Sequence, residues 1–405
     1  MTIRSASGDA SHKDLASRRT SLPPHWPRLI GAVERPGSAG EWAGDAETWE
    51  AFLRDLQGNG LFPLAYRAWR EAGTLETLPE GARRAAEARM TAYRAGWTGA
   101  WEEIAKVLGL FAGAGLRPVL LKGADLALRY YPEPHLRPLT DLDVLFPSTT
   151  EAESAFGLLE KAGFRPGKQG IPMDEWVLSQ HLPDLHAPGT GFPVEVHGAL
   201  VVSPRDSRWA GGAVRLLEGR RSYAWRGLAL EGLAPEALVV HLCAHIWDQH
   251  AGEPPKAGVA FDLRAVLERE GLAFDWNRLV DLSRASGFSG AVVVGLRALE
   301  AALGVSAPEG VLSALSGAEK GAVLGLSPRS ALTQRLLGRL WHGPGPASAL
   351  KAAWRIAVPS RAYLRERYPE KGRWPVLLLY PYRWGDQGWK LLRWGGERLG
   401  LGSRE

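Results

Sequence analysis

Cysteine is almost absent from this 405-residue chain, which contains only Cys243. A single thiol excludes an internal disulfide and leaves no cysteine-based zinc site. Long apolar runs are also missing: no stretch approaches about 18 uninterrupted apolar residues, so no membrane-spanning helix is predicted. The first twenty residues have no apolar core of the kind that a secretion signal needs. These absences favour a cytoplasmic protein.

Composition is otherwise ordinary, with 45% hydrophobic and 23% charged residues, and a chain of this length is expected to hold two or three modules. The start is rich in Ser, Arg, Gly and Pro without periodicity, which is typical of a mobile tail. Pattern and composition divide the chain into five segments: a mobile tail at 1–40, a helical segment at 41–115, a mixed α/β core at 116–232, a second helical segment at 233–340 and a basic, Trp-rich arm at 341–405.

Two helices beside the core are predicted from their patterns. Apolar residues recur at intervals of four, three, four and three from Trp97 to Phe111, as on one face of a helix that Gly113 and Gly115 end. A further helix is predicted over about 149–162, with Gly163 just past its end.

The most informative run extends from Leu120 to Phe146 and reads LLKGADLALRYYPEPHLRPLTDLDVLF. Its pattern predicts a strand, a tight turn, a helix, a basic loop and a second strand. On the second strand Asp141 and Asp143 are two residues apart, which places both carboxylates on one face. The opposite face points into a core with Leu142, Val144 and Phe146. Two acids beside a turn with free backbone donors suit a triphosphate held by magnesium.

On these residues the run resembles the core motif of the nucleotidyltransferase superfamily that includes DNA polymerase beta. It is more closely similar to a bacterial family of uncharacterised nucleotidyltransferases, in which a Lys-Gly pair replaces the usual Gly-Ser turn. The pair is matched by Lys122 and Gly123, and the acids by Asp141 and Asp143.

Two further positions extend the resemblance. Arg137 matches the basic residue before the acids. The third acid of the superfamily lies on a neighbouring strand, and Glu195 in PVEVHGAL fills that position, followed by the expected His197. The resemblance implies an α/β (α+β) fold with a small mixed nucleotidyltransferase sheet at 116–232 between N-terminal and C-terminal helical segments.

The resemblance also implies a chemistry. A nucleoside monophosphate would pass from a nucleoside triphosphate to an acceptor, with two Mg²⁺ ions, or Mn²⁺ in their place, at the reacting phosphate. Asp141 and Asp143 would bridge the ions, and Glu195 would ligate one of them or act as base toward the acceptor hydroxyl.

The phosphates would be bound by three residues of the run. Gly123 would let the backbone approach them, Lys122 would place charge on the β- or γ-phosphate, and Arg137 would clamp a phosphate. Purely structural roles stay open: Lys122 as a solvated turn residue, Arg137 as a partner of Asp141, and His197 as a satisfied core histidine.

Helices are again predicted between residues 235 and 303, with Pro235 in a first turn. His241 and His245 lie one turn apart, but Leu242 occupies the position where a zinc protease needs Glu. In the next helix Asp262 borders an apolar stripe, a position from which it would hydrogen-bond a histidine. The resemblance includes these positions, which are interpreted mainly as structural, with substrate contact as the alternative.

The C-terminal arm is strongly basic. Residues 351–405 hold twelve Lys or Arg and five Asp or Glu, a net charge of +7, together with five tryptophans. Such a segment binds nucleic acid or an anionic membrane surface, or docks its tryptophans onto the protein, and docking is the favoured hypothesis.

The sequence therefore predicts a metal-dependent nucleotidyltransferase that uses a nucleoside triphosphate. The acceptor stays open among a small molecule, a peptide or protein, and a nucleic acid. Two alternatives are a catalytically silent nucleotide-binding scaffold or sensor, and a nucleic-acid-binding protein that uses the basic arm.

Overall fold

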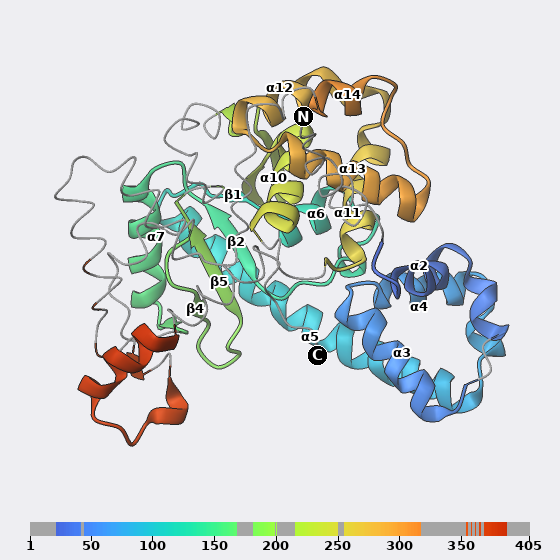
Figure 1. Ribbon diagram of the computed structural model, residues 1–405, viewed down its shortest axis with the longest axis horizontal. Coiled ribbons are helices and arrows are strands. Elements are labelled where there is room, and N and C mark those ends of the chain that lie inside the picture. The colour runs from blue at the N-terminus through green and yellow to red at the C-terminus, as the bar shows by residue number, and fades with distance from the viewer. Residues whose placement is uncertain are drawn as a thin grey trace, which may run out of the picture.

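The computed structural model describes residues 22–41, 44–167, 181–198, 200, 215–249 and 255–316, and in the C-terminal arm 354, 358, 361, 364–365 and 368–386. A seven-stranded mixed sheet lies between two hydrophobic cores, with helices before and after it in the chain (Figure 1). This arrangement confirms the predicted α/β nucleotidyltransferase-type fold with flanking helical segments. The division into five segments remains a prediction.

Helices occupy most of the described chain before the sheet: α2 (Trp26–Glu34), η1 (Pro36–Glu41), α3 (Ala46–Gly58), α4 (Phe62–Glu71), η2 (Leu75–Thr77) and α5 (Glu80–Gly113). Asp45 caps α3, where its Oδ1 accepts a hydrogen bond from the Thr48 backbone N–H at 2.8 Å.

The prediction of a mobile tail at 1–40 is wrong for its last part, because α2 is a packed helix. Trp26 and Leu29 are almost fully buried, and the Trp26 indole N–H donates to the Pro255 carbonyl oxygen at 3.2 Å. These contacts come from distant parts of the chain, so local composition could not reveal them. Residues 1–21 lie outside the described part.

α5 and α7 (Thr149–Lys161) cover one face of the sheet, and both predicted helices are confirmed. Trp97 on the stripe of α5 is half-buried, while the rest of that stripe is buried: Trp101, Ile104, Leu108 and Phe111. Figure 1 shows α5 extending from the N-terminal helices to the sheet. The helix α7 ends before Gly163, whose φ of +95° suits the end of a helix.

The sheet consists of seven short strands: β1 (Val119–Leu120), β2 (Leu142–Leu145), β3 (Arg165–Pro166), β4 (Leu185–His186), β5 (Pro193–His197), β6 (Arg221–Trp225) and β7 (Leu228–Gly232). Their order is β3-β4-β5-β2-β1-β7-β6. The pairs β2–β5 and β1–β7 are parallel, and the other pairs are antiparallel. Helix α6 (Lys122–Arg129) and the short turn η3 (Pro134–Leu136) connect β1 to β2.

Alternation along β2 decides which way its acid points. Leu142 and Val144 pack into the core beneath α5 and α7, as predicted, whereas Leu145 packs into the second core with the C-terminal helices. Asp143 lies on the Leu145 side of the strand. The carboxylate therefore faces the side of the sheet where the C-terminal helices lie.

The helices after the sheet are α10 (Pro235–Ala244), a π-helical turn η4 (His245–Gln249), α11 (Gly258–Glu270), η5 (Gly271–Ala273), α12 (Trp276–Ser286), α13 (Ser289–Leu303) and α14 (Val311–Ser316). Pro235 begins α10, as predicted. Throughout the described ranges, every helix is too short or too polar to cross a lipid bilayer.

The C-terminal arm forms a small cluster of its own. Leu364, Tyr368 and Leu379 are buried there, next to the 3-10 turn η7 (Pro369–Lys371). The arm is predicted to dock its tryptophans onto the protein; the three that the structure describes, Trp354, Trp374 and Trp384, are 67%, 39% and 52% exposed. Leucine and tyrosine side chains fill the cluster instead. Trp389 and Trp394 lie outside the described residues.

Candidate active site

Two carboxylates lie side by side at the centre of the sheet. In the parallel β2–β5 pair, Asp143 is the register partner of Glu195. Asp143 is 2% exposed, whereas Glu195 is half-buried. Their neighbours Val144 and Val196 point into the opposite core. The structure thus places Glu195 on the strand beside the acid motif, where the resemblance located the third acid.

Asp143 is held by two nitrogen donors on the same oxygen. Lys122 Nζ donates to Oδ1 at 2.7 Å, and His197 Nε2 lies 2.9 Å from that atom. Burial by itself would raise the pKa of Asp143, but the charge of Lys122 and the hydrogen bond of His197 hold it well below its usual range. The carboxylate is therefore ionised at neutral pH.

Lys122 and Gly123, predicted to form a tight turn, are instead the first two residues of α6, and both are sterically constrained. Lys122 has a φ of +45°, a left-handed conformation that a side chain rarely adopts. A Cβ on Gly123 would lie 2.9 Å from Leu139 Cδ2, so a glycine fits closely against the loop before β2. Lys122 also keeps its charge: burial lowers its pKa, but Asp143 and, less strongly, Glu195 and Asp141 raise it above the usual value.

A metal ion could be held beside Asp143. Ligand atoms of Asp143, Glu195 and His197 all lie within 4.8 Å of one another. His197 is fully buried between the two carboxylates, with Nε2 at 3.4 Å from Glu195 Oε2. Burial lowers the pKa of His197, but its hydrogen bonds to Asp143 and Glu195 raise it above its usual value. Two carboxylates that a buried imidazole orients suit a divalent cation.

Asp141 lies one residue before β2 and does not belong to that group of three. Its carboxylate accepts a hydrogen bond from the Thr140 hydroxyl at 3.2 Å. Burial, and then the charge of Asp143, raise the pKa of Asp141 to about 6. The side chain is close enough to sense Asp143, and it is more readily protonated than an ordinary aspartate.

Arg137 has a different partner from the expected one. Its Nε donates to Asp262 Oδ1 at 2.8 Å and its Nη2 to Asp262 Oδ2 at 3.0 Å, which makes a bidentate ion pair. The suggested pairing of Arg137 with Asp141 is therefore wrong. Tyr131 Oη also donates to Asp262 Oδ1, at 2.7 Å. Asp262 thereby links the loop before β2 to α11. A phosphate contact by Arg137 would require this pair to open.

His241 on α10 faces the same region, and His245 follows it at the start of η4. His241 is 1% exposed, and within the described part of the chain neither of its ring nitrogens has a hydrogen-bond partner. The prediction that Asp262 bonds a histidine is therefore wrong for His241. Burial first, and then the charge of Lys122, hold the pKa of His241 well below its usual value, so the ring is neutral. His245 stacks on it, with ring centroids 6.4 Å apart.

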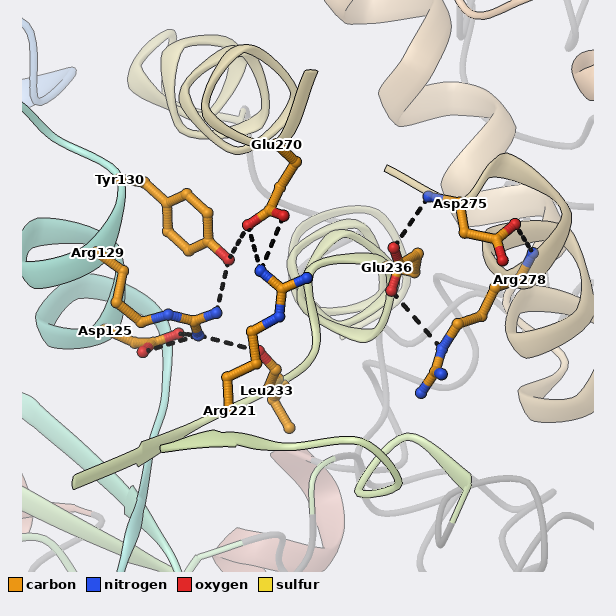
Figure 2. Close-up of polar contacts among 9 residues, drawn as sticks. All are labelled: Asp125, Arg129, Tyr130, Arg221, Leu233, Glu236, Glu270, Asp275 and Arg278. Carbon is orange, nitrogen blue, oxygen red and sulfur yellow. Dashed lines mark hydrogen bonds and ion pairs between the residues drawn. The ribbon is translucent and has the colours of Figure 1, made fainter. Parts of the chain in front are cut away.

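A buried polar network that was not predicted from the sequence supports α6 (Figure 2). Asp125 is fully buried and accepts from Arg129 Nη1 at 2.9 Å, and the same nitrogen donates to the Leu233 carbonyl oxygen at 2.9 Å. Tyr223 Oη donates to Asp125 at 3.0 Å. These bonds tie the helix that begins with Lys122 to the β6–β7 hairpin and the start of α10. The four-residue spacing of Asp125 and Arg129 was the available signal, but the same spacing is common on exposed helix faces.

Comparison with known proteins agrees with this geometry. Among curated proteins, none matches the chain. A family model described as uncharacterised nucleotidyltransferase matches residues 45–304, which is more than half of the chain and includes the whole sheet and its two acidic strands. The chain therefore belongs to this family of uncharacterised nucleotidyltransferases.

Proposed function

We propose that the protein transfers a nucleoside monophosphate from a nucleoside triphosphate to an acceptor hydroxyl, in a reaction that depends on a divalent metal. The oxygen of the acceptor would attack the α-phosphorus, the bond to the β-phosphate would break, and pyrophosphate would leave. The observation that carries the proposal is the pairing of Asp143 with Glu195 across β2 and β5, together with the hydrogen bond that Lys122 Nζ donates to the Asp143 carboxylate.

The metal would be held by Asp143 and Glu195, with Asp141 beside them, and would supply Lewis acidity toward the phosphate oxygens. His197 would orient the two carboxylates through its ring nitrogen. Its Nε2 lies 2.9 Å from Asp143 Oδ1 and 3.4 Å from Glu195 Oε2. An oxygen-rich donor set favours Mg²⁺, and the nearby imidazole keeps Mn²⁺ as the alternative.

Lys122 is proposed to bind the triphosphate. Its ammonium group now neutralises Asp143. If the Asp143 oxygen bound the metal instead, the ammonium of Lys122 would be available for an oxygen of the β- or γ-phosphate. Gly123 would keep the turn compact, with Leu139 closing one side of it.

Glu195 and His241 are proposed to bind the acceptor hydroxyl. The Glu195 side chain is 24% exposed, so it can reach a bound hydroxyl as a base as well as a ligand. A neutral His241 can both donate and accept a hydrogen bond, and a buried imidazole that has no hydrogen-bond partner among the described residues is costly unless something binds to it. These two groups would hold the acceptor oxygen, whether it belongs to a small molecule, a peptide or a nucleic acid.

Release of pyrophosphate tests the proposal. The purified protein is incubated with each nucleoside triphosphate, Mg²⁺ or Mn²⁺, and fractionated cell extract, and labelled products are sought. We expect release that a chelator abolishes, and that Asp143→Asn reduces by at least a hundredfold. Asp55→Asn on the exposed face of α3 is the matched control and should retain full activity.

Two results would count against the proposal. Because Asp143→Asn leaves Lys122 without its carboxylate, Glu195→Gln is measured as well, since it preserves the Lys122–Asp143 pair. Full activity in both variants would refute the metal site. Triphosphate binding without any metal-dependent turnover would instead support the silent nucleotide-binding scaffold.

A further inference from the structure

Exposed apolar side chains are concentrated in one part of this protein. Six large hydrophobic residues in the described chain are exposed, and five of them belong to the C-terminal arm: Trp354 at 67%, Trp374 at 39%, Leu377 at 70%, Leu378 at 51% and Trp384 at 52%. The sixth, Leu272, lies in the turn η5. A concentration of this kind, in contrast to scattered single residues, marks a surface that contacts something apolar.

The exposed residues of the arm follow one side of a helix. The chain is helical over 376–386, and Leu377, Leu378, Pro381 and Trp384 recur there at intervals of one, three and three, with Trp374 two residues before the helix begins. This is the spacing of a single helical face. All five are exposed, so the stripe points outward.

The other side of the same helix explains why the stripe stays outside. Leu379 is fully buried with Leu364 and Tyr368, and Val376, Tyr380 and Tyr382 pack against them. Tyr368 Oη and Asp386 Oδ2 are hydrogen-bonded at 2.9 Å, which ties the end of the helix to the segment before it. The arm therefore has a small core that presents an apolar stripe to its surroundings.

Basic residues lie beside the stripe, in a segment whose sequence is strongly basic. Residues 351–405 carry a net charge of +7. Lys371 Nζ lies 5.1 Å from the ring centroid of Trp374 and 5.1 Å from that of Tyr382, and Arg373 is exposed next to Trp374. Aromatic and aliphatic residues on one face, with Lys and Arg beside them, are the composition of a helix that lies in the plane of an anionic membrane surface.

We propose that this surface, Lys371–Trp384, docks onto an anionic lipid bilayer. The leucines favour lipid over nucleic acid, because an aliphatic side chain enters acyl chains readily but does not stack on bases as an aromatic ring does. The charge opposes a second copy of the chain as occupant, since two arms of +7 would repel each other. Docking would bring the acceptor site to molecules held at that bilayer, and it does not depend on the proposed chemistry.

Sedimentation of the full chain with lipid vesicles tests this. Vesicles of phosphatidylglycerol and phosphatidylcholine should bind the protein, and vesicles of phosphatidylcholine alone should bind it much less. The double variant Leu377→Ser/Leu378→Ser should bind at least tenfold more weakly, because it removes two exposed leucines that would enter the acyl chains of the bilayer. Lys371→Gln/Arg373→Gln should also bind more weakly and should depend less on salt concentration.

Leu272→Ser is the matched control, because it removes the exposed leucine that lies away from the arm, and it should bind like the wild type. Absence of binding to anionic vesicles would overturn the proposal, as would unchanged binding by the leucine variant. Binding to single-stranded RNA that the leucine variant retains would point to nucleic acid instead. Self-association that the leucine variant abolishes would point to a second copy.

Discussion

Lys122 combines an unusual backbone with a functional side chain, and two substitutions separate these features. Its φ is +45°, and among described residues other than glycine only Arg226 shares a positive φ. Lys122→Gly removes the amine and relieves the backbone, whereas Lys122→Ala removes the amine alone. The glycine variant should be more stable by about 1 kcal/mol, which thermal melts of the two proteins would measure.

Both variants should bind the triphosphate roughly tenfold more weakly, because each loses a charge-assisted hydrogen bond. Equal melting temperatures would show that the turn is not strained. Wild-type affinity in both would show that the phosphates bind elsewhere.

Asp125 makes stability depend on pH. Burial raises its pKa to about 6, despite the opposing charge of Arg129. The folded protein therefore keeps the Asp125 proton over a pH range in which the unfolded chain has already lost it. This contribution to stability is present below about pH 4 and is lost as pH rises through about 6, at a cost of about 3 kcal/mol.

The corresponding experiment compares denaturant unfolding of the wild type and Asp125→Asn at pH 4 and pH 7. Asparagine does not titrate, so the variant should gain stability relative to the wild type between these two values. A constant difference would mean that Asp125 does not titrate in this window.

At the scale of elements, one substitution should have opposite effects in two helices. Gly295 lies where α13 meets α10, and a Cβ there would meet Cys243 Sγ and Trp247. Gly99 lies on the exposed side of α5 with nothing within 4 Å. Gly295→Ala should destabilise the protein by about 1–3 kcal/mol, and Gly99→Ala should stabilise it by up to about 1 kcal/mol. The two melting temperatures should shift in opposite directions.

The link between the acid motif and α11 is the Arg137–Asp262 ion pair. Removal of either partner leaves a mostly buried charge unpaired, so each single variant should lose about 3 kcal/mol or more of stability. A double-mutant cycle of Arg137→Met and Asp262→Asn should therefore show coupling of about 1–3 kcal/mol.

Triphosphate affinity separates two roles for this pair. If Arg137 only positions the loop before β2, both single variants should lower turnover to a similar degree and leave affinity for the triphosphate unchanged. A loss of triphosphate affinity in Arg137→Met, but not in Asp262→Asn, would support the predicted contact between Arg137 and a phosphate.

At the scale of the whole molecule, the arm and the body are packed separately. No residue after Leu315 belongs to either large core of the described chain, and the arm has its own cluster. Deletion of 351–405 should therefore leave the melting temperature within about 2 °C of the full chain and remove vesicle binding. Aggregation of the shortened protein, or a lower melting temperature, would show that the arm packs against the rest of the protein and covers apolar surface there.

The sequence by itself determined the parts of the site that are contiguous. The strand–helix–strand order and the shared face predicted for Asp141 and Asp143 follow from local pattern, because period-two alternation is a property of neighbouring residues. The roles of Lys122 and Gly123 were implied by the resemblance to a family. Glu195 was predicted from the resemblance to a family. The structure confirms that it lies next to Asp143.

Tertiary structure alone decided the partners. Asp262 lies 125 residues from Arg137, and His197 lies 54 residues from Asp143. The packing of α2 depends on a contact 229 residues away. No local pattern specifies which buried charges meet, because pairing follows from how β2, β5 and α11 come together. The same holds for the arm. Its small core is formed by Leu364, Tyr368 and Leu379, whereas its described tryptophans are exposed.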